Sequence, residues 1–343
     1  MQFASDNTSG MAPEILAALA AANGGHAPSY GAEDGMLRTT ALLREIFEAP
    51  EAAVCLVATG TAANALSLAV LCPPWSTVFC HEHAHVAEDE CGAPEFYTHG
   101  ARLVPVMGAH GKIAPADLAA AFATTGAGGV HGMQRGAVSL SNVTEAGTVY
   151  TPTEIAALTA VARSFELPVH LDGARFANAI AATGASAADM TWRAGVDVLS
   201  FGGTKNGCMG VEAVVIFDPA KAWEFELRRK RGGHLFSKHR FLSAQMAAYL
   251  EGGLWLRLAG VANAMAGRLA AGLTAVPGLT QKHPVQANMM FPEWPAGTAA
   301  RAQAAGARFY GWGLPDGREG ARLVTSWSTT AGDVDAFLSA LAG

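Results

Sequence analysis

Short apolar runs alternate with helix-forming stretches along most of this chain, and this alternation constrains the fold more than any other feature. Seven runs are typical of strands: residues 52–60, 76–80, 101–107, 136–142, 167–172, 197–203 and 210–218. Ala- and Leu-rich stretches such as 61–71 and the amphipathic, capped stretch 151–166 lie between them. Strands that alternate with helices favour a mostly parallel sheet covered on both faces. We therefore predict an α/β fold.

The pattern changes near residue 250. A long Ala-rich helix comes first, followed by the short apolar runs 287–291, 308–313 and 321–327 and a final helix. The chain has 343 residues, 50% of them hydrophobic and only 15% charged, which suits a globular protein with a large core. Because this length is long for one simple core, we expect two domains. We predict a large domain over 1–250 and a small α+β domain over 251–343.

Charge and cysteine content exclude several classes of protein. The net charge is −6 with a pI near 6.0, and the basic run at 226–240 lacks interleaved aromatic residues, so a nucleic-acid partner is not expected. Five cysteines without a CxxC pair indicate a reducing compartment. The polar N-terminus is not a signal peptide, and no apolar run reaches membrane-spanning length. We expect a cytoplasmic protein with no membrane partner.

Polar residues follow the strand at 52–60, where it turns into a helix. Residues 58–64 place Gly60, Thr61 and Asn64 at this turn. Ligands of parallel α/β sheets bind beyond the carboxyl ends of the strands, and a helix N-terminus attracts anions. The pattern is neither a Walker loop nor GxGxxG. A phosphate site and a simple helix cap therefore both remain open.

An aspartate ends the strand at 167–172, and an arginine follows three residues later. A buried Asp172 requires a partner, because burying an unpaired carboxylate is costly. One suitable partner is a protonated heterocyclic nitrogen of a cofactor. The other is a structural ion pair with Arg175. The residues alone favour neither.

Lys205 follows the strand at 197–203 in a chain that is poor in charge. A desolvated lysine becomes nucleophilic toward carbonyls, although a surface lysine is the commoner case. A phosphate site, an aspartate and a lysine in this order match the needs of pyridoxal 5′-phosphate (PLP). The aspartate keeps the ring nitrogen protonated, and the lysine forms a Schiff base. The sequence therefore predicts a PLP enzyme.

A metal site is the rival hypothesis. His81, His83 and His85 alternate along the chain, and three acidic residues occupy 88–90, as in some metal-dependent hydrolases. However, the later strand ends offer a lysine and an arginine rather than further ligands. We therefore favour a polar active-site loop with one functional histidine, and we expect no metal.

Seven segments together carry a family resemblance: "ASDN", "YGAED", "ATGTAAN", "HAHVAEDECGAPEF", "VHLDGARFANA", "FGGTKNG" and "ARLVTSW". They resemble the low-specificity L-threonine aldolases, which are PLP enzymes of the aspartate-aminotransferase fold (fold type I). The similarity keeps the same order from Phe3 to the final helix. "DECGAPEF" and "FGGTKNG" are similar to the bacterial branch that also accepts phenylserine. The resemblance implies this fold, with a mostly parallel seven-stranded sheet in the large domain.

The resemblance also implies a role for each matching residue of the cofactor site. Lys205 would hold the cofactor, and Asp172 would pair with its ring nitrogen. Arg175 would bond the phenolic oxygen or approach the substrate carboxylate. His85 would stack on the ring and is a candidate base for the substrate hydroxyl, directly or through a water. The residues implied for the phosphate are Gly60, Thr61 and Asn64.

Four more positions match residues around the substrate. Ser5 and Arg322 correspond to the pair that grips the α-carboxylate. Tyr30, toward the substrate, and Arg240, toward the cofactor, match positions that a neighbouring subunit lends to the pocket. The resemblance therefore implies a homo-oligomer, a dimer or a dimer of dimers, with shared active sites.

One stretch departs from the family pattern. Many relatives carry a second histidine near the substrate hydroxyl, in a stretch like "EN-T-H-N". The equivalent stretch here is "SNVTEAG", which places Thr144 and Glu145 at these positions. A mechanism that needs two histidines is therefore in doubt.

The predicted reaction is cleavage of the Cα–Cβ bond of a β-hydroxy-α-amino acid, which gives glycine and an aldehyde. L-Threonine, L-allo-threonine and phenylserine are the substrates that the resemblance implies. A PLP-dependent β-eliminating lyase or an aminotransferase is the alternative, and it would yield a keto acid instead of an aldehyde with glycine.

Overall fold

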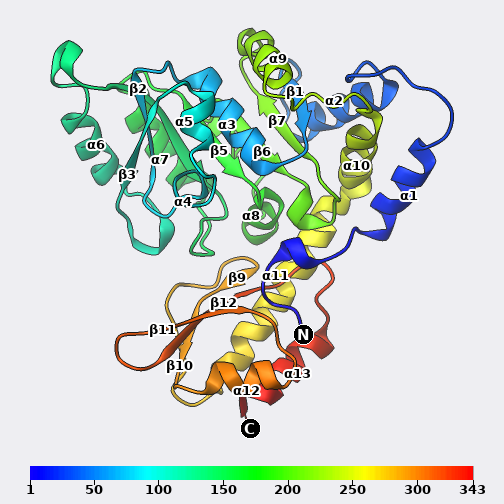
Figure 1. The fold of residues 1–343 in the computed structure, drawn as a ribbon, viewed down its shortest axis with the longest axis vertical. Helices are drawn as coiled ribbons and strands as arrows, with labels where there is room; N and C mark the ends of the chain where they lie inside the picture. Colours follow the sequence, from blue (N-terminus) through cyan, green and yellow to red (C-terminus); the bar gives the residue numbers. More distant parts are fainter. Residues whose placement is uncertain (343) are drawn as a thin grey trace.

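A seven-stranded sheet forms the centre of the larger part of the protein (Figure 1). The computed structural model describes residues 1–342. The strands lie in the order β1-β7-β6-β5-β4-β2-β3, and only β7 runs antiparallel to its neighbours. They are β1 (Ala53–Val57), β2 (Ser76–His81), β3 (Arg102–Val106), β4 (Gln134–Ser141), β5 (Val169–Gly173), β6 (Val198–Gly202) and β7 (Glu212–Ile216). The predicted mostly parallel sheet of seven strands is confirmed.

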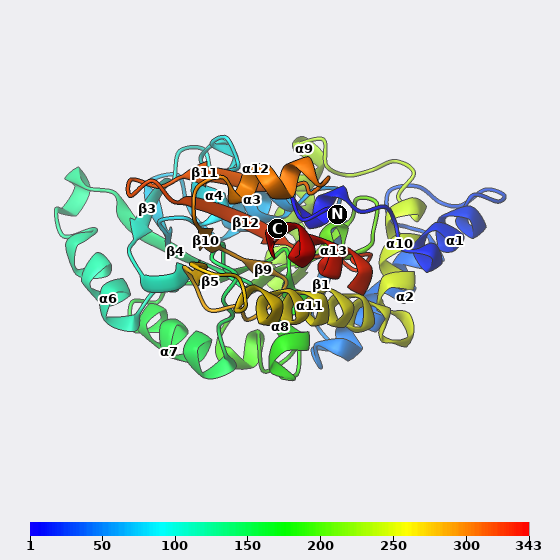
Figure 2. The same cartoon turned by 90° about the horizontal axis from the view of Figure 1, so that it is seen from below.

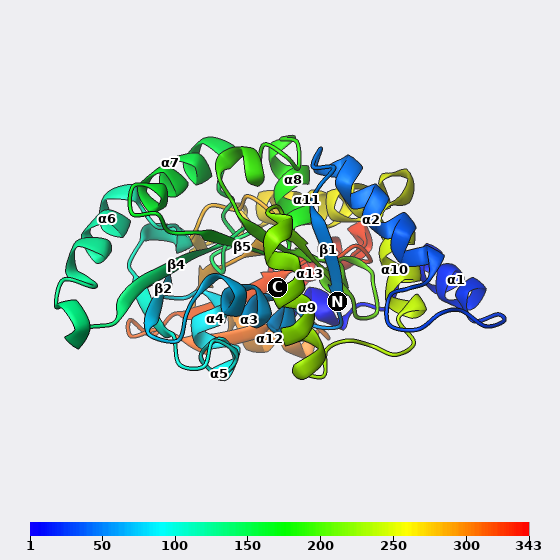
Figure 3. The ribbon, with the colours of Figure 1, turned by 90° about the horizontal axis from the view of Figure 1, so that it is seen from above.

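Helices cover both faces of this sheet (Figures 2 and 3). One face carries α6 (Pro115–Thr124), α7 (Pro152–Arg163) and α8 (Phe176–Thr183), and the other carries α3 (Gly60–Leu71), α4 (His85–Glu88), α5 (Ala93–Tyr97) and α9 (Ala222–Arg231). Next to β1, at one end of the sheet, lie α1 (Pro13–Ala22), α2 (Asp34–Ile46) and α10 (Arg240–Leu250). No helix within residues 1–342 is long and apolar enough to cross a membrane.

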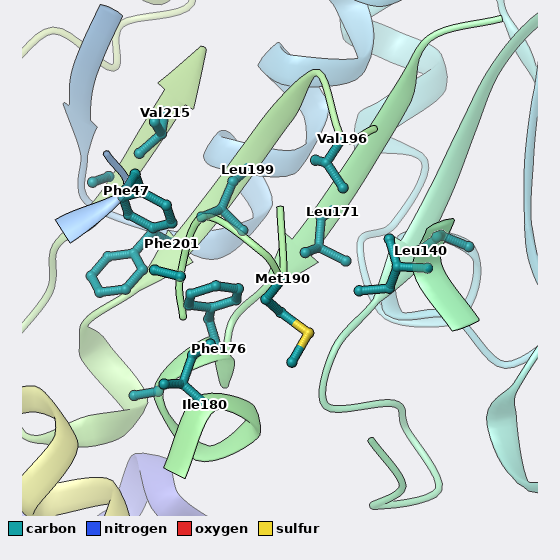
Figure 4. Close-up of a cluster of buried hydrophobic side chains, with 14 of the residues drawn as sticks. Phe47, Leu140, Leu171, Phe176, Ile180, Met190, Val196, Leu199, Phe201 and Val215 are labelled. Carbon is teal, nitrogen blue, oxygen red and sulfur yellow. The ribbon is translucent and has the colours of Figure 1, made fainter. Parts of the chain in front are cut away.

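Local sequence explains these elements. Every residue of β2, β5, β6 and β7 is buried, as expected for strands covered on both faces. Helix α7 begins with a capping box, in which Thr151 accepts from the Glu154 amide and the Glu154 side chain accepts from Thr151. A strip of aromatic rings packs beneath the central strands (Figure 4). There the ring of Phe201 lies 5.9 Å from that of Phe176 and 5.6 Å from that of Trp255.

The smaller part contains a second, antiparallel sheet and confirms the predicted small α+β unit. Its strands are β8 (Thr280–Gln281), β9 (Met289–Met290), β10 (Pro292–Trp294), β11 (Tyr310–Gly313) and β12 (Glu319–Val324), and its helices include α12 (Thr298–Ala304) and α13 (Ala331–Ala342). Helix α11 (Leu254–Leu273) runs from the larger part into the smaller one (Figure 1). Its first half packs in the large core and its second half in the small core.

The N-terminal segment also belongs to the small core. Phe3 is fully buried there, and its carbonyl accepts from the Val324 amide at 2.8 Å. The short 3₁₀ turn η1 (Asp6–Thr8) then leads the chain toward the large part. The division at residue 250 remains a prediction, and the packing places Phe3 and α11 across it.

Candidate active site

A cavity of about 300 Å³ lies where β1, β5 and β6 end. It is the natural ligand position in this architecture, because the loops beyond the carboxyl ends of parallel strands meet there. The cavity brings together seven of the residues selected from the sequence, namely Gly60, Thr61, Asn64, His85, Asp172, Arg175 and Lys205.

The start of α3 forms one wall of this cavity. Thr59, which the sequence analysis did not select, caps the helix, since its Oγ1 accepts from the Ala62 amide at 3.2 Å. The other N–H groups of a first helical turn have no partner inside the helix and attract anions. Among the described residues, a Cβ atom added at Gly60 would meet no atom within 4 Å. This open helix start fits a phosphate group.

Asp172 lies at the end of β5 with only 5% of its surface exposed. Its Oδ1 accepts from the Ala174 amide at 3.0 Å, and its Oδ2 accepts from Asn64 Nδ2 at 3.0 Å. These bonds fix the orientation of the carboxylate at the cavity wall. The second N–H of Asn64 Nδ2 is donated to Glu90 Oε1 at 2.9 Å, so the amide has no donor left for a phosphate. The Asn64 side chain thus supports Asp172 in this structure, and its contact with a phosphate stays a prediction.

Glu90 is a site residue that the sequence suggested only for the rival metal site. Its side chain is fully buried, and its Oε1 lies 2.9 Å from Nδ1 of His85. The hydrogen bond to Glu90 raises the pKa of His85 against the opposing effect of burial. Burial raises the pKa of Glu90. Nδ1 of His85 is thus engaged, and Nε2 is the ring nitrogen left to act in the cavity.

Arg175 pairs with Asp6 rather than with Asp172. Its Nε donates to Asp6 Oδ2 at 2.7 Å and its Nη2 to Asp6 Oδ1 at 2.9 Å, with both side chains buried. The structural ion pair considered from the sequence, with Asp172, is therefore replaced by one with a residue 169 positions away. This pair fixes η1 against the loop between β5 and α8.

Lys205 lies in the short 3₁₀ turn η5 (Thr204–Asn206), directly after β6, and lines the cavity. Glu212, at the start of β7, lines the same cavity. Its Oε2 accepts from the Gly203 amide at 2.8 Å. Glu212 was expected only as part of an apolar strand, although an acidic residue inside such a run is a usable signal.

The three alternating histidines have separate partners. His81 Nε2 lies 3.0 Å from the Gly108 carbonyl, and His83 Nδ1 lies 3.0 Å from Glu88 Oε1. His85 bonds Glu90, as described above. Within residues 1–342, no group of three or more His, Cys, Asp or Glu side chains is arranged to hold a metal ion. The geometry therefore does not assemble the ligand set of the rival hypothesis.

A second cavity, of about 360 Å³, adjoins the first and contains Arg322. Glu145 lines both cavities. Arg322 Nη2 donates to the Ala4 carbonyl at 3.2 Å, and its buried Nε has no partner within the described residues. Ser5 caps η1 by accepting from the Asn7 amide, and Asn7 lines the first cavity. Ser5 and Arg322 thus lie at the border of the site.

Thr144 is buried and lines neither cavity, so it does not take the place of a base near the substrate. Its Oγ1 lies 2.8 Å from Oγ1 of Thr148, inside the loop after β4. Glu145, next to it, faces the cavities. Of the two residues at the departure from the family stretch, Thr144 therefore bonds within its own loop, and Glu145 places a polar side chain in the cavities.

Tyr30 and Arg240 do not line either cavity of this chain. Tyr30 is 48% exposed, and Lys230 Nζ lies 4.7 Å from the centre of its ring. Arg240 Nη1 donates to the carbonyls of Gly24 and Gly25 at 3.2 and 3.1 Å. Within one chain, the structure does not bring these two residues to the site.

The sheet, the helix start and the residues at the strand ends are those of an enzyme of the aspartate-aminotransferase fold. Comparison with known proteins agrees. The family model described as "Beta-eliminating lyase" matches residues 2–294. The low specificity L-threonine aldolase of Pseudomonas aeruginosa is 43% identical over 331 residues, which cover 96% of this chain and 93% of that protein.

Solved structures extend the likeness. The Leishmania major threonine aldolase superposes with a TM-score of 0.94 at 29% identity and covers 99% of this chain and 98% of its own. Oryza sativa TDC with PLP and tryptamine superposes with a TM-score of 0.75 at 14% identity, covering 99% of this chain and 82% of its own, and shares the fold. The chain belongs to the beta-eliminating lyase family and, within it, to the low-specificity L-threonine aldolases.

Proposed function

We propose that this protein is a PLP-dependent aldolase that cleaves L-threonine, L-allo-threonine and related β-hydroxy-α-amino acids to glycine and an aldehyde. The observation that carries the proposal is the meeting of Lys205, Asp172 and the His85–Glu90 pair in one cavity. Two of these groups suit the cofactor, and the third suits a proton transfer from the substrate. The family and the relatives described above support it.

The residues present fit PLP. The open start of α3 at Gly60 and Thr61 suits the phosphate, and Asp172 presents a fixed carboxylate to a protonated ring nitrogen. Lys205 is the amine for covalent attachment, and Arg175 lines the same cavity. When bound, the cofactor supplies the electron sink for the pair left on Cα.

His85 is the proposed base. Because Glu90 holds Nδ1, Nε2 is left to take the proton of the substrate β-hydroxyl, directly or through an ordered water. A base with a pKa near neutrality suits this transfer, and histidine has one. Glu90 fixes the ring orientation and stabilises the imidazolium that forms. Removal of the hydroxyl proton favours breakage of the Cα–Cβ bond.

Arg322 is the proposed anchor of the substrate α-carboxylate. Its buried Nε lacks a partner within residues 1–342, so a carboxylate would satisfy it. Ser5 lies close by in the N-terminal segment, since Arg322 bonds the preceding carbonyl of Ala4. The second cavity beside Arg322 is the proposed space for the substrate side chain.

We further propose a homo-oligomer, a dimer or a dimer of dimers, in the cytoplasm. Tyr30 and Arg240 line neither of the two cavities of the candidate site in their own chain, which fits a contribution to a neighbouring site. Large apolar side chains such as Leu37 and Trp223 are about 70% exposed and suit subunit contacts. The five cysteines are free, which fits a reducing compartment.

The test compares wild type, Lys205→Ala and, as a control lysine outside the cavity, Lys221→Ala. We expect wild type and Lys221→Ala to bind PLP as yellow proteins and to release aldehyde and glycine from L-threonine and L-phenylserine. Lys205→Ala should lose both properties. A yellow wild type that forms a keto acid without aldehyde would support the β-eliminating or aminotransferase alternative. A colourless wild type would refute the cofactor assignment.

A further inference from the structure

The acidic side chain of Glu212 lies in the cavity wall between two functional loops. The backbone of Glu212 pairs with Val57 on one side and with Gly202 on the other. Val57 ends β1, which leads into the start of α3, and Gly202 ends β6, which leads into Lys205. Both paired residues are uncharged. Glu212 therefore lies between two functional segments. One is the start of α3 at Gly60 and Thr61, which we call the phosphate cradle, and the other is the turn η5, which carries Lys205.

Glu212 is 7% exposed and lines the cavity together with Gly60, Thr61 and Lys205. Its Oε2 accepts from the Gly203 amide at 2.8 Å, which ties it to the turn that carries Lys205. A further negative charge brought into this cavity would repel an ionised Glu212, because the surroundings are poorly solvated. Binding of an anion at the cradle must therefore favour the protonated, neutral form of a carboxyl group in this wall.

Glu212 changes its protonation state near neutral pH. Burial raises its pKa to about 7, although its hydrogen bonds and the charge of Lys205 oppose this. The titratable groups coupled to it are Lys205 and Cys208, from the segment between β6 and β7, and Tyr249, from α10. The other titratable side chains that line the same cavity are His85, Glu90, Glu145, Asp172 and Arg175. Lys205 is the one cation among the three coupled groups. A bound dianion would therefore push the equilibrium toward the neutral acid.

We propose that Glu212 is a proton-linked positioning residue of the phosphate cradle, which takes up one proton from solvent when a dianionic oxyanion binds at the start of α3. The proton adds to the carboxylate, and no other bond is made or broken. When the anion leaves, the proton returns to solvent, and Oε2 accepts from the Gly203 amide in both protonation states. This inference rests on the proposed cofactor site, because it takes the phosphate of PLP to be the physiological anion.

Sulfate is a suitable probe because it stays a dianion throughout the neutral range and has no aldehyde to react with Lys205. Its dissociation constant would be measured by calorimetry on the full chain freed of cofactor, at about pH 6.5 and about pH 8.5. One linked proton changes an affinity by at most about tenfold per pH unit. We expect wild type to bind sulfate about 3- to 10-fold more weakly at the higher pH and to take up protons on binding in buffers of different ionisation enthalpy.

Glu212→Gln keeps an oxygen that can accept from the Gly203 amide but cannot change its charge. We expect this variant to lose most of the pH dependence and of the proton uptake, while contributions of Lys205 and His85 remain in both proteins. Glu319→Gln is the matched control, because Glu319 accepts backbone amides at the start of α12 in the smaller part. Its sulfate profile should match that of wild type.

Four outcomes would overturn the inference. Equal pH dependence in wild type and Glu212→Gln would show that Glu212 is only an acceptor for the Gly203 amide. If Glu212→Gln does not fold, absence of proton uptake by wild type alone would refute it. If wild type binds PLP as a yellow protein but does not bind sulfate at any pH, the inference fails while the proposed function stands. A wild type that binds neither would remove both.

Discussion

The buried pair of Asp6 and Arg175 supports the most quantitative prediction. Arg175 makes two short bonds to Asp6, and both side chains are at most 7% exposed. Removal of one partner leaves the other charge buried and unpaired, which costs about 3–5 kcal/mol. Asp6→Ala should therefore lower the free energy of unfolding by about 3–5 kcal/mol. Asn288, whose Nδ2 donates to Asp6 Oδ2 at 3.1 Å, loses an acceptor as well.

A surface pair of the same geometry provides the control. Arg268 also makes bidentate bonds to Asp335, but these side chains are 49% and 54% exposed. Asp335→Ala should cost no more than about 1 kcal/mol. Urea unfolding of the cofactor-free chain measures both changes without a contribution from ligand binding. A cost for Asp6→Ala no larger than that for Asp335→Ala would refute the assignment of a buried, uncompensated charge.

The same comparison has a defined pH dependence. Burial alone would raise the pKa of Asp6, but the charge and hydrogen bonds of Arg175 outweigh it and hold this pKa below the usual 3.8. A carboxyl group with a depressed pKa stabilises the folded state above its unfolded-state pKa and loses this contribution as the pH falls through its folded-state pKa. The difference between wild type and Asp6→Ala should therefore be constant near neutrality and shrink in acid below about pH 4.

Three further predictions concern the site and the core. Glu90→Gln should lower kcat about 10- to 100-fold, because the His85 ring would be held less firmly. The acidic limb of the pH profile of kcat should move to lower pH, because Glu90 raises the pKa of His85. An unchanged acidic limb, or an equal effect of Glu88→Gln, would contradict the His85–Glu90 pair. Gly60→Ala should leave the chain as stable or stabilise it by up to about 1 kcal/mol while weakening PLP binding in a spectroscopic titration, whereas full PLP affinity would place the phosphate elsewhere. Phe201→Ala should cost about 3–5 kcal/mol in urea unfolding because it opens a cavity among buried aromatic rings, and a cost below about 1 kcal/mol would contradict that packing.

Local patterns predict the strands and the residues at their ends well. Asp172 and Lys205 follow apolar runs, and in a parallel sheet such positions meet at one edge, so their meeting in one cavity follows from strand pattern and handedness. The antiparallel direction of β7 has both a local and a distant component. β7 pairs antiparallel with β6 directly before it, by the Gly202–Glu212 register, and this connection is too short for a parallel crossover. Its second pairing, with β1 by the Val57–Glu212 register, joins segments more than 150 positions apart, and no local pattern encodes it.

The partners of individual side chains are the part that the sequence does not reveal. Arg175 lies three residues from Asp172, yet the fold brings Asp6 to it. Asn64 sits at a helix start where a phosphate contact is reasonable, but its amide is shared between Asp172 and Glu90. Each of these choices depends on distances between elements that are distant in sequence. They are set by packing, not by residue type.

Helix α11 makes the two parts of this protein a single folding unit. Leu258 and residues before it complete the large core, while Ala266, Leu269 and Leu273 complete the small one. Because Phe3 also lies in the small core, the smaller part contains both an early and a late segment of the chain. Cleavage of the chain at one position therefore cannot separate the two parts and leave the apolar surface of each covered. Heat or urea should therefore unfold both parts together, and any closing motion over the substrate must carry α11 with it.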